Sequence, residues 1–518
     1  MKKIITIGLF AALSLSGCKS KLEDLYTNPE QTTNPSIEKF FTQMLNNDRI
    51  FPKYWDMRTF QLTQTGVFSQ ASSYYNDLKR YQLQPYTDER WQNYYTSGGN
   101  GSGIVSHYRE IERAYAALSA EDKKKADIFV QAAKIVYLDQ TAQIVDMWGD
   151  IPFSEAGKLN LTGGEVIKPK YDAQKDVYEA VIKGLGEAAA YFATATGTTT
   201  FAKQDILLSG DVKKWQRLAN SLRLRALMRI SFVDEARAKT DVMAMLNDPT
   251  TYPLLETDNA LLQPLTNYTG SLLNAFTEGA SYVAPYYLLE SVLKPANDPR
   301  IPVMYDKYGR TENGKWIANT SYNALPLSMT SNDQNTNVSK GAYAIVDSAT
   351  FLNNSKLPGV VFSSAETNFL KAEAFERWGS SATAEAAYNL GVKQSVNYYY
   401  MLNNVSNTGR KETAPAGAAI DAWIASSVKY TGSSSDKLAQ IWTQKWVQFG
   451  FMQTIQSWAE YRRTKFPKLT FVPDTNPGTE LPPSRLLYPA QERTLNADNY
   501  KAVSGQDKLT NKIFWDVK

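Results

Sequence analysis

The sequence predicts a mainly α-helical protein, built from antiparallel helical hairpins, with long irregular loop insertions between them. Apolar residues recur at helical spacing in several long segments, and no comparable series of alternating strands occurs. The composition agrees, because 43% hydrophobic and 21% charged residues in a chain of 518 suit a globular protein with a large core. We therefore expect a folded helical body rather than a disordered chain.

The first residues have the pattern of a lipoprotein signal peptide. Two lysines precede an apolar run at residues 4–15, which is too short to span a bilayer because a spanning helix needs about 20 apolar residues. The run ends in Leu15-Ser16-Gly17-Cys18, which resembles a bacterial lipobox. We predict that residues 1–17 are removed and that Cys18 carries a lipid, whose acyl chains (palmitate, for example) anchor the mature protein to a membrane.

A polar segment separates this anchor from the rest of the chain. Within residues 18–35, Asn28-Pro29 and Asn34-Pro35 favour extended or turn conformations over helix. We expect residues 18–35 to form a lipidated, flexible tether and residues 36–518 to form a single helical body.

Three apolar stripes define helices in the first half of that body. They cover residues 128–145, 178–192 and 215–230, and each repeats every three or four residues. Asp172 and Asp211 precede the second and third stripes as expected N-caps. Residues 250–360 differ, because they are rich in Pro, Asn, Thr and Ser; we expect a long irregular insertion there with a few short strands.

A repeat signature follows the insertion. Ala372-x2-Phe375 and Ala384-x3-Tyr388-x2-Gly391 have the small and aromatic spacing of a tetratricopeptide unit, in which small residues let two antiparallel helices approach. A generic helical hairpin would show the same features, so both interpretations remain open on these residues alone. Either way, the chain is expected to be built from helical hairpins.

Charge and rare residues exclude several classes of function. A net charge of +4, from 56 basic and 52 acidic residues, is too small for an electrostatic nucleic-acid binder. A single Cys excludes a disulfide framework and zinc sites based on cysteine, and a single His excludes histidine-rich metal centres. We expect no metal and no cofactor.

Catalytic motifs are also weak. A histidine-dependent nucleophile would have to use His107, and Asn100 breaks the Gly-x-Ser-x-Gly pattern around Ser102. Gly309-x4-Gly314-Lys315 imitates a phosphate-binding loop, but Trp316 follows where Ser or Thr must meet magnesium.

Paired carboxylates leave one enzymatic alternative open. Asp146 and Asp150 are four residues apart, yet Asp150 falls in the turn after a predicted helix, where capping and hydrogen bonding are the simpler roles. We predict that the protein is not an enzyme, with an all-helical glycoside hydrolase anchored at the surface as the alternative.

Several segments, in this order along the chain, resemble the SusD/RagB-type nutrient-binding outer-membrane lipoproteins of Bacteroidota. They are Asp24-Leu25-Tyr26-Thr27-Asn28-Pro29, Trp148-Gly149-Asp150-Ile151-Pro152, Ala219-Asn220-Ser221-Leu222-Arg223, Asp298-Pro299-Arg300, Gln444-Lys445-Trp446, Trp458-Ala459-Glu460-Tyr461-Arg462-Arg463-Thr464 and Leu487-Tyr488-Pro489. The resemblance implies a tetratricopeptide-like superhelix decorated by ligand-binding loops. It also implies an outer-membrane position facing the cell exterior and a partner, a TonB-dependent barrel of the SusC type. These shared motifs look architectural and do not identify the ligand.

Aromatic residues are the expected ligand contacts, because the rings of Tyr and Trp stack on the apolar faces of sugars while their polar atoms bond hydroxyls. The chain has 31 Tyr and 11 Trp. The candidates outside the helical stripes are Tyr74, Tyr75, Trp91, Tyr94, Tyr95 and Trp316, which we expect to line one face.

The sequence thus leaves three functions. The first is a lid that captures an oligosaccharide or a peptide for a barrel transporter without catalysis. The second is the surface-anchored hydrolase. The third is a structural subunit of an outer-membrane assembly that has lost its ligand site.

Overall fold

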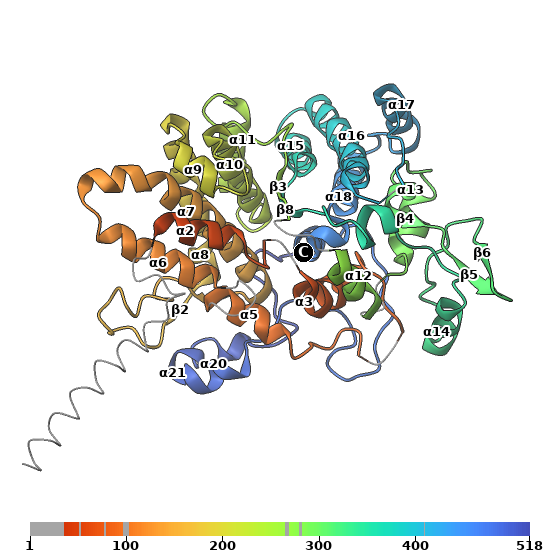
Figure 1. The fold of residues 1–518 in the computed structure, drawn as a ribbon, viewed down its shortest axis with the longest axis horizontal. Coiled ribbons are helices and arrows are strands. Elements are labelled where there is room, and N and C mark those ends of the chain that lie inside the picture. The colour runs from red at the N-terminus through yellow and green to blue at the C-terminus, as the bar shows by residue number, and fades with distance from the viewer. Residues whose placement is uncertain are drawn as a thin grey trace, which may run out of the picture.

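Antiparallel helices build most of the molecule, as Figure 1 shows for this computed structural model. The structure describes residues 36–50, 53–76, 79–96, 103–264, 269–278, 282–408 and 410–518. The predicted signal peptide, the lipidated Cys18 and the tether lie outside these residues.

The N-terminal part of the body consists of long helices with short connections. Its elements are α2 (Ile37–Leu45), α3 (Tyr54–Asp56), η1 (Met57–Thr65), α4 (Gly66–Phe68), α5 (Thr87–Tyr95), α6 (Ile104–Ala116), α7 (Ala120–Trp148), β1 (Ile151–Pro152), β2 (Tyr171–Asp172), α8 (Gln174–Thr194), α9 (Thr199–Gln204), α10 (Val212–Arg229) and α11 (Glu235–Asn247). All three predicted stripes lie on α7, α8 and α10, whose apolar faces pack against one another.

The caps of these helices differ in one detail from the prediction. Asp211 is the N-cap of α10 and accepts hydrogen bonds from the backbone N–H groups of Lys213 and Lys214, as expected. Asp172 does not cap α8, because Ala173 holds that position and Asp172 instead accepts bonds from the backbone N–H groups of Phe153 and Ser154. The β1–β2 pairing places Asp172 opposite Ile151, which brings its carboxylate to this turn.

The middle of the chain contains more helix than the sequence indicated. Its elements are β3 (Ala260–Leu262), α12 (Thr269–Glu278), η2 (Tyr287–Leu293), α13 (Ile301–Met304), β4 (Tyr305–Asp306), β5 (Gly309–Glu312), β6 (Lys315–Ala318), α14 (Ser331–Ser339), β7 (Ile345–Val346), η3 (Ser348–Leu352) and β8 (Gly359–Phe362). The strands pair antiparallel as β3–β8, β4–β7 and β5–β6. The predicted short strands are present, but residues 250–360 also form several short helical segments that lack a long apolar stripe.

The C-terminal part contains the predicted repeat unit. Its elements are α15 (Ser364–Trp378), α16 (Ser381–Val405), α17 (Gly417–Ser427), α18 (Ser434–Phe449), η4 (Gly450–Gln453), α19 (Thr454–Thr464), α20 (Ala490–Leu495), α21 (Ala497–Tyr500) and η5 (Ser504–Gln506). Helices α15 and α16 form an antiparallel hairpin, in which a Cβ at Gly391 would lie only 3.0 Å from the Phe369 ring. The small residue at position 391 therefore allows the two helices to approach closely, as predicted. The order of the elements confirms the mainly α fold of helical hairpins.

Two apolar cores meet along a line of buried charges. The first core surrounds α7, α8 and α10, and the second surrounds α15, α16 and α18. Between them, the Arg463 guanidinium donates to both carboxylate oxygens of Glu373 (2.7 and 2.6 Å) and also to Glu460 (3.0 and 2.8 Å). Arg229 on α10 bonds Glu460 from the other side. Such a network ties helices that are distant in sequence.

Two further findings concern the described residues only. None of their helices combines the length and the apolar character that a bilayer crossing requires. They also contain no group of three or more His, Cys, Asp or Glu side chains arranged to hold a metal ion.

Candidate ligand-binding site

The β5–β6 hairpin lies at one end of the molecule (Figure 1), and two aromatic side chains in and beside it are exposed. Asn313 and Gly314 form its turn, both with positive φ (50° and 74°), which is the turn that Asn-Gly sequences favour in tight hairpins. In the register of the pair, Trp316 lies opposite Thr311. Every residue of β6 is exposed, so the hairpin projects from the body with little of its own surface buried.

Trp316 and Tyr308 are the exposed rings of this hairpin region. Their exposed fractions are 55% and 39%, which is high for aromatic side chains. The ring centroids are 5.3 Å apart with 72° between the planes, an edge-to-face contact. The contact holds each ring against the other and leaves their remaining faces free for a ligand.

A hollow of about 850 Å³ lies beside these two rings. Tyr282 and residues 338–342, which are the end of α14 and the turn after it, line its other side. Gly341 allows this packing, because a Cβ there would lie 1.9 Å from the carbonyl oxygen of Gly309. The side chain of Asn319 fixes the same junction by donating to the carbonyl oxygens of Lys307 (2.9 Å) and Gly341 (2.8 Å).

The hollow also contains charged groups that can bond hydroxyls. Arg310, Glu312 and Lys340 line it. The Arg310 Nε atom lies 2.5 Å from Glu312 Oε1, and both side chains are about half exposed. Rings beside separate donors and acceptors are the arrangement by which proteins bind sugars and other polar oligomers.

Tyr75 is brought to the same region from a distant part of the sequence. Burial and the neighbouring hydroxyls of Tyr282 and Tyr343 raise the pKa of Tyr75 to about 12. The next residue, Asn76, donates to the carbonyl oxygens of Leu327 (2.5 Å) and Met329 (2.6 Å), which ties this loop to the segment before α14. Tyr75 and Trp316 are therefore the predicted residues that the fold brings toward one region.

The other four candidates do not lie at this hollow: Tyr74, Trp91 and Tyr94 are buried, and Tyr95 is partly buried against the first core. Tyr74 is buried, with Tyr81 bonding its hydroxyl. Trp91 is only 2% exposed and packs edge-on against Trp148, with centroids 5.4 Å apart. The remaining two bond buried or backbone groups: Tyr94 shares a hydrogen bond with Thr141, and Tyr95 donates to the carbonyl oxygen of Pro152.

Helical spacing explains why three of these rings pack inward. Trp91, Tyr94 and Tyr95 occupy positions i, i+3 and i+4 of α5, which form one face of a helix. That face packs on α7 and the segment around Tyr488. In Figure 1, α5 also lies far from β5 and β6 along the long axis of the molecule.

Asp146, Asp150 and His107, which were considered for catalysis, have structural partners. Asp150 accepts from the backbone N–H of Gln174 and from Gln506, which is the hydrogen-bonding role expected for it. Asp146 is buried; that burial raises its pKa, while Tyr178 and Trp515 donate hydrogen bonds to the carboxylate and Arg229 forms an ion pair with it. His107 is buried on α6 with Nδ1 2.7 Å from the carbonyl oxygen of Gly103, and Ser102 lies outside the described residues.

Comparisons with known proteins agree on one family. A SusD-like family model, described as "Starch-binding associating with outer membrane", matches residues 25–489. A comparison with curated proteins finds no match. Among solved structures, one described as a chitin-binding protein is 25% identical, with a TM-score of 0.72 over 94% of this chain and 100% of the other.

Two further solved structures have the same fold. A chitin-binding SusD homologue from Flavobacterium johnsoniae is 21% identical, with a TM-score of 0.67 over 93% of this chain and 99% of the other. A SusD homologue from Bacteroides fragilis is 19% identical, with a TM-score of 0.71 over 93% and 100%.

Proposed function

The chain belongs to the SusD-like family, and from this premise we propose that it is a non-catalytic lipoprotein that captures an oligosaccharide or a peptide at the surface of the outer membrane. The family description, starch-binding and associated with the outer membrane, supports both the binding role and the location.

The observation that carries the proposal is the exposed pair of rings beside the hollow. Exposed Trp and Tyr are costly to leave in water, and an edge-to-face pair with free outer faces offers stacking surfaces for the C–H faces of sugar rings. About 850 Å³ is within the volume range of small-molecule sites, roughly 300–1,000 Å³, and holds several sugar units. The charged side chains beside it supply orientation.

Saccharide is the ligand class we favour over peptide. Two of the similar solved structures are described as chitin-binding. The sequence identities between this chain and those two proteins are 25% and 21%. A saccharide ligand is therefore our proposal for this chain.

Binding without catalysis is favoured by the state of the buried carboxylates. A glycosidase needs two carboxyl groups facing a bound sugar, about 5 to 10 Å apart. Asp139 and Asp146 both approach one cavity, but that cavity measures about 20 Å³, which is room for little more than one water molecule. Arg225 and Arg229 pair with these two carboxylates.

The proposed partner is a TonB-dependent barrel of the SusC type, over which this chain acts as a lid. Cys18 and residues 18–35 would hold the lid to the outer leaflet and let the body swing. Ligand can favour the closed lid only by binding it better than the open one, by about 5.5 kcal/mol for a change from 1:99 to 99:1. The ligand must therefore contact both lid and barrel in the closed state.

One experiment separates capture from hydrolysis. Purified protein lacking residues 1–17 is titrated with chitin, starch and xylan oligomers and with short peptides in a calorimeter, and the same mixtures are analysed for products after one day. The proposal expects binding of at least one oligomer with the oligomer recovered intact. Shortened oligomers would favour the hydrolase, and no binding to any glycan or peptide would favour the structural subunit.

A further inference from the structure

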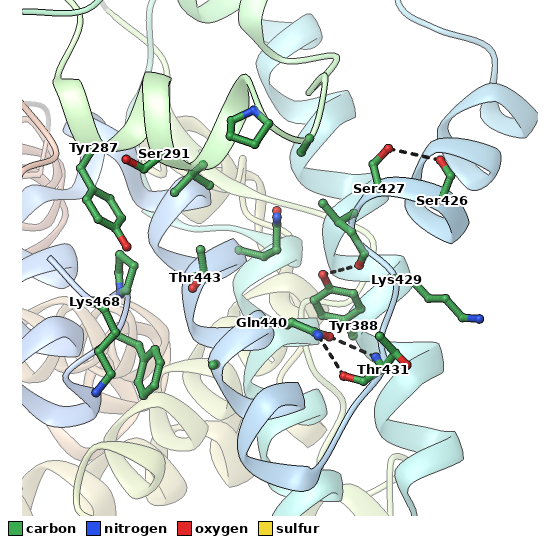
Figure 2. Close-up of a pocket in the computed structure, with 18 residues that line it drawn as sticks. Tyr287, Ser291, Tyr388, Ser426, Ser427, Lys429, Thr431, Gln440, Thr443 and Lys468 are labelled. Carbon is green, nitrogen blue, oxygen red and sulfur yellow. Dashed lines mark hydrogen bonds between the residues drawn. The ribbon is translucent and has the colours of Figure 1, made fainter.

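A second cavity lies away from the aromatic hairpin, between η2, α16, α18 and the segment after α19 (Figure 2). Its volume is about 630 Å³, large enough for a disaccharide or a short peptide. None of its lining residues belongs to the hollow beside Trp316. The proposed function therefore leaves this cavity unused.

A buried amide points into this cavity with unused donors. Gln444 on α18 is 4% exposed, and its Oε1 accepts a hydrogen bond of 2.7 Å from Arg300 Nη2. A guanidinium group can only donate, so the amide oxygen must face Arg300 and the NH2 group must face away from it. Within the described chain no residue accepts from that NH2 group, although Gln444 lines the cavity.

The position of this amide is fixed from behind. Arg300 is fully buried, and its Nε and Nη2 atoms donate to the two carboxylate oxygens of Asp298 at 2.9 and 2.6 Å. Its Nη1 atom donates to the hydroxyl of Ser395 at 2.8 Å. Asp298 neutralises the guanidinium charge, so the chain of contacts from Asp298 through Arg300 to Gln444 presents a rigid, neutral N–H donor.

The charges around the cavity have one sign. Lys429 and Lys468 lie on its rim and are exposed, and none of the eighteen residues that line it is acidic. Ser291 and Thr443 add hydroxyl groups on the wall between the two lysines, as Figure 2 shows. A fixed N–H donor in the wall and a cation at each side favour a ligand that accepts hydrogen bonds and carries negative charge.

We propose that this cavity is a second ligand site, which binds a small acidic molecule: the NH2 group of Gln444 donates to a carboxylate oxygen, and Lys429 and Lys468, at opposite sides of the cavity, supply positive charge around it. Two sources share this chemistry: a uronic acid unit of an oligosaccharide and the free C-terminus of a short peptide. The site acts independently of the hollow beside Trp316.

The test uses digalacturonate as the probe and calorimetry as the readout. Gln444→Glu keeps an oxygen toward Arg300 and replaces the NH2 group with a carboxylate oxygen, so it should weaken digalacturonate binding by at least about tenfold. Lys468→Ala, at an exposed position, should weaken it several-fold and cannot act through misfolding of the core. Lys124→Ala makes the same charge change at an exposed position of α7 and should have no effect.

Further titrations show whether the bound carboxylate comes from a uronic acid or from a peptide, and they separate this cavity from the hollow beside Trp316. Triglycine with a free C-terminus, compared with its C-terminal amide, tests the peptide source by the same variants. In Trp316→Ala, the digalacturonate binding event that Gln444→Glu weakens should persist, whether or not the hollow beside Trp316 binds a ligand. The proposal is overturned if neither acidic probe binds at millimolar concentration, if neutral cellobiose or the peptide amide binds as well, or if Gln444→Glu and Lys468→Ala both bind like wild type.

Discussion

Trp316 meets Tyr308 edge to face, with the ring centroids 5.3 Å apart and 72° between the ring planes. The two rings come from opposite sides of one tight turn, and each is more than one third exposed. A pair held in this way needs no rearrangement before it stacks on a ligand. Pre-organised rings therefore contribute binding free energy without a large cost in side-chain entropy.

Replacing Trp316 with alanine should weaken binding of the preferred oligomer by about 1–3 kcal/mol, because a central aromatic contact is lost. Stability should change by less than about 0.5 kcal/mol, since the ring is exposed. Calorimetric titration measures the first quantity and urea unfolding the second. Ile317→Ala is the matched control, because the neighbouring strand residue points to the other face and does not line the hollow. Equal affinity of Trp316→Ala and wild type would show that ligand binds elsewhere.

Trp91→Ala should lower the stability of the fold and leave the affinity for the oligomer unchanged, which is the opposite of the effects expected for Trp316→Ala. Its ring is 2% exposed and packs against Trp148 and Tyr488, so truncation leaves a cavity in the core and should cost about 3–5 kcal/mol of unfolding free energy. Affinity of the folded variant for the oligomer should stay at the wild-type value. If the variant were as stable as wild type but bound the oligomer more weakly, Trp91 would be a ligand contact and not a core residue.

The contrast between these two tryptophans shows where sequence patterns inform and where they fail. Helices α7, α8 and α10 follow from apolar spacing, because a helix that packs on one side must repeat its apolar residues every three or four positions. The same rule applied to Trp91, Tyr94 and Tyr95 would have placed them in the core. Likewise, Asn313-Gly314 is a hairpin signal that indicates the β5–β6 turn directly.

The rest of the site could not be predicted from local patterns. Tyr282 and Tyr75 reach the region of Trp316 through contacts between segments far apart in the chain, such as the bonds from Asn76 to residues 327 and 329. The sequence around Gln444 indicates only that this residue lies on a helix. The contact between Gln444 and Arg300 is seen only in the folded structure. Non-local pairing of this kind depends on the whole topology.

Replacing Cys18 with alanine should release the protein from membranes, because a single lipid-bearing residue is expected to supply the attachment. Fractionation of cells should move the variant from the membrane pellet to the soluble fraction, and an alkyne fatty acid should label wild type alone. Ser20→Ala is a matched control two residues away and should remain in the pellet. An unlabelled wild-type protein that stays in the membrane would contradict the lipid anchor.

Glu373→Gln should destabilise the fold by about 3–5 kcal/mol at pH 7, because it removes one of the two carboxylates that compensate the buried Arg463 guanidinium and Lys445 ammonium groups. Urea unfolding at pH 7 measures the loss. Glu121→Gln removes the same charge at the surface of α7 and should change stability by less than about 0.5 kcal/mol. Equal losses in the two variants would show that the buried network contributes nothing specific.

The same carboxyl group predicts a pH dependence. Burial alone would raise its pKa, but Arg463 and Lys445 hold the pKa of Glu373 at about 2, below the ordinary 4.5. A folded pKa below the unfolded one stabilises the protein above pH 4.5, and this stability is lost as pH falls from 4.5 toward 2. The gap between wild type and Glu373→Gln should therefore narrow by about 2 kcal/mol between pH 7 and pH 3. A gap that stays constant or widens would contradict this assignment.

The measurement that tests the central claim most directly is cryo-electron microscopy of whatever co-purifies with the tagged chain from detergent-solubilised outer membranes, with and without the preferred oligomer. The account predicts a SusC-type barrel in the preparation, a lid that swings between open and closed positions, and ligand density against Trp316 at the boundary of lid and barrel. Purification of the chain alone, with no barrel cross-linked to it in cells, would contradict the account.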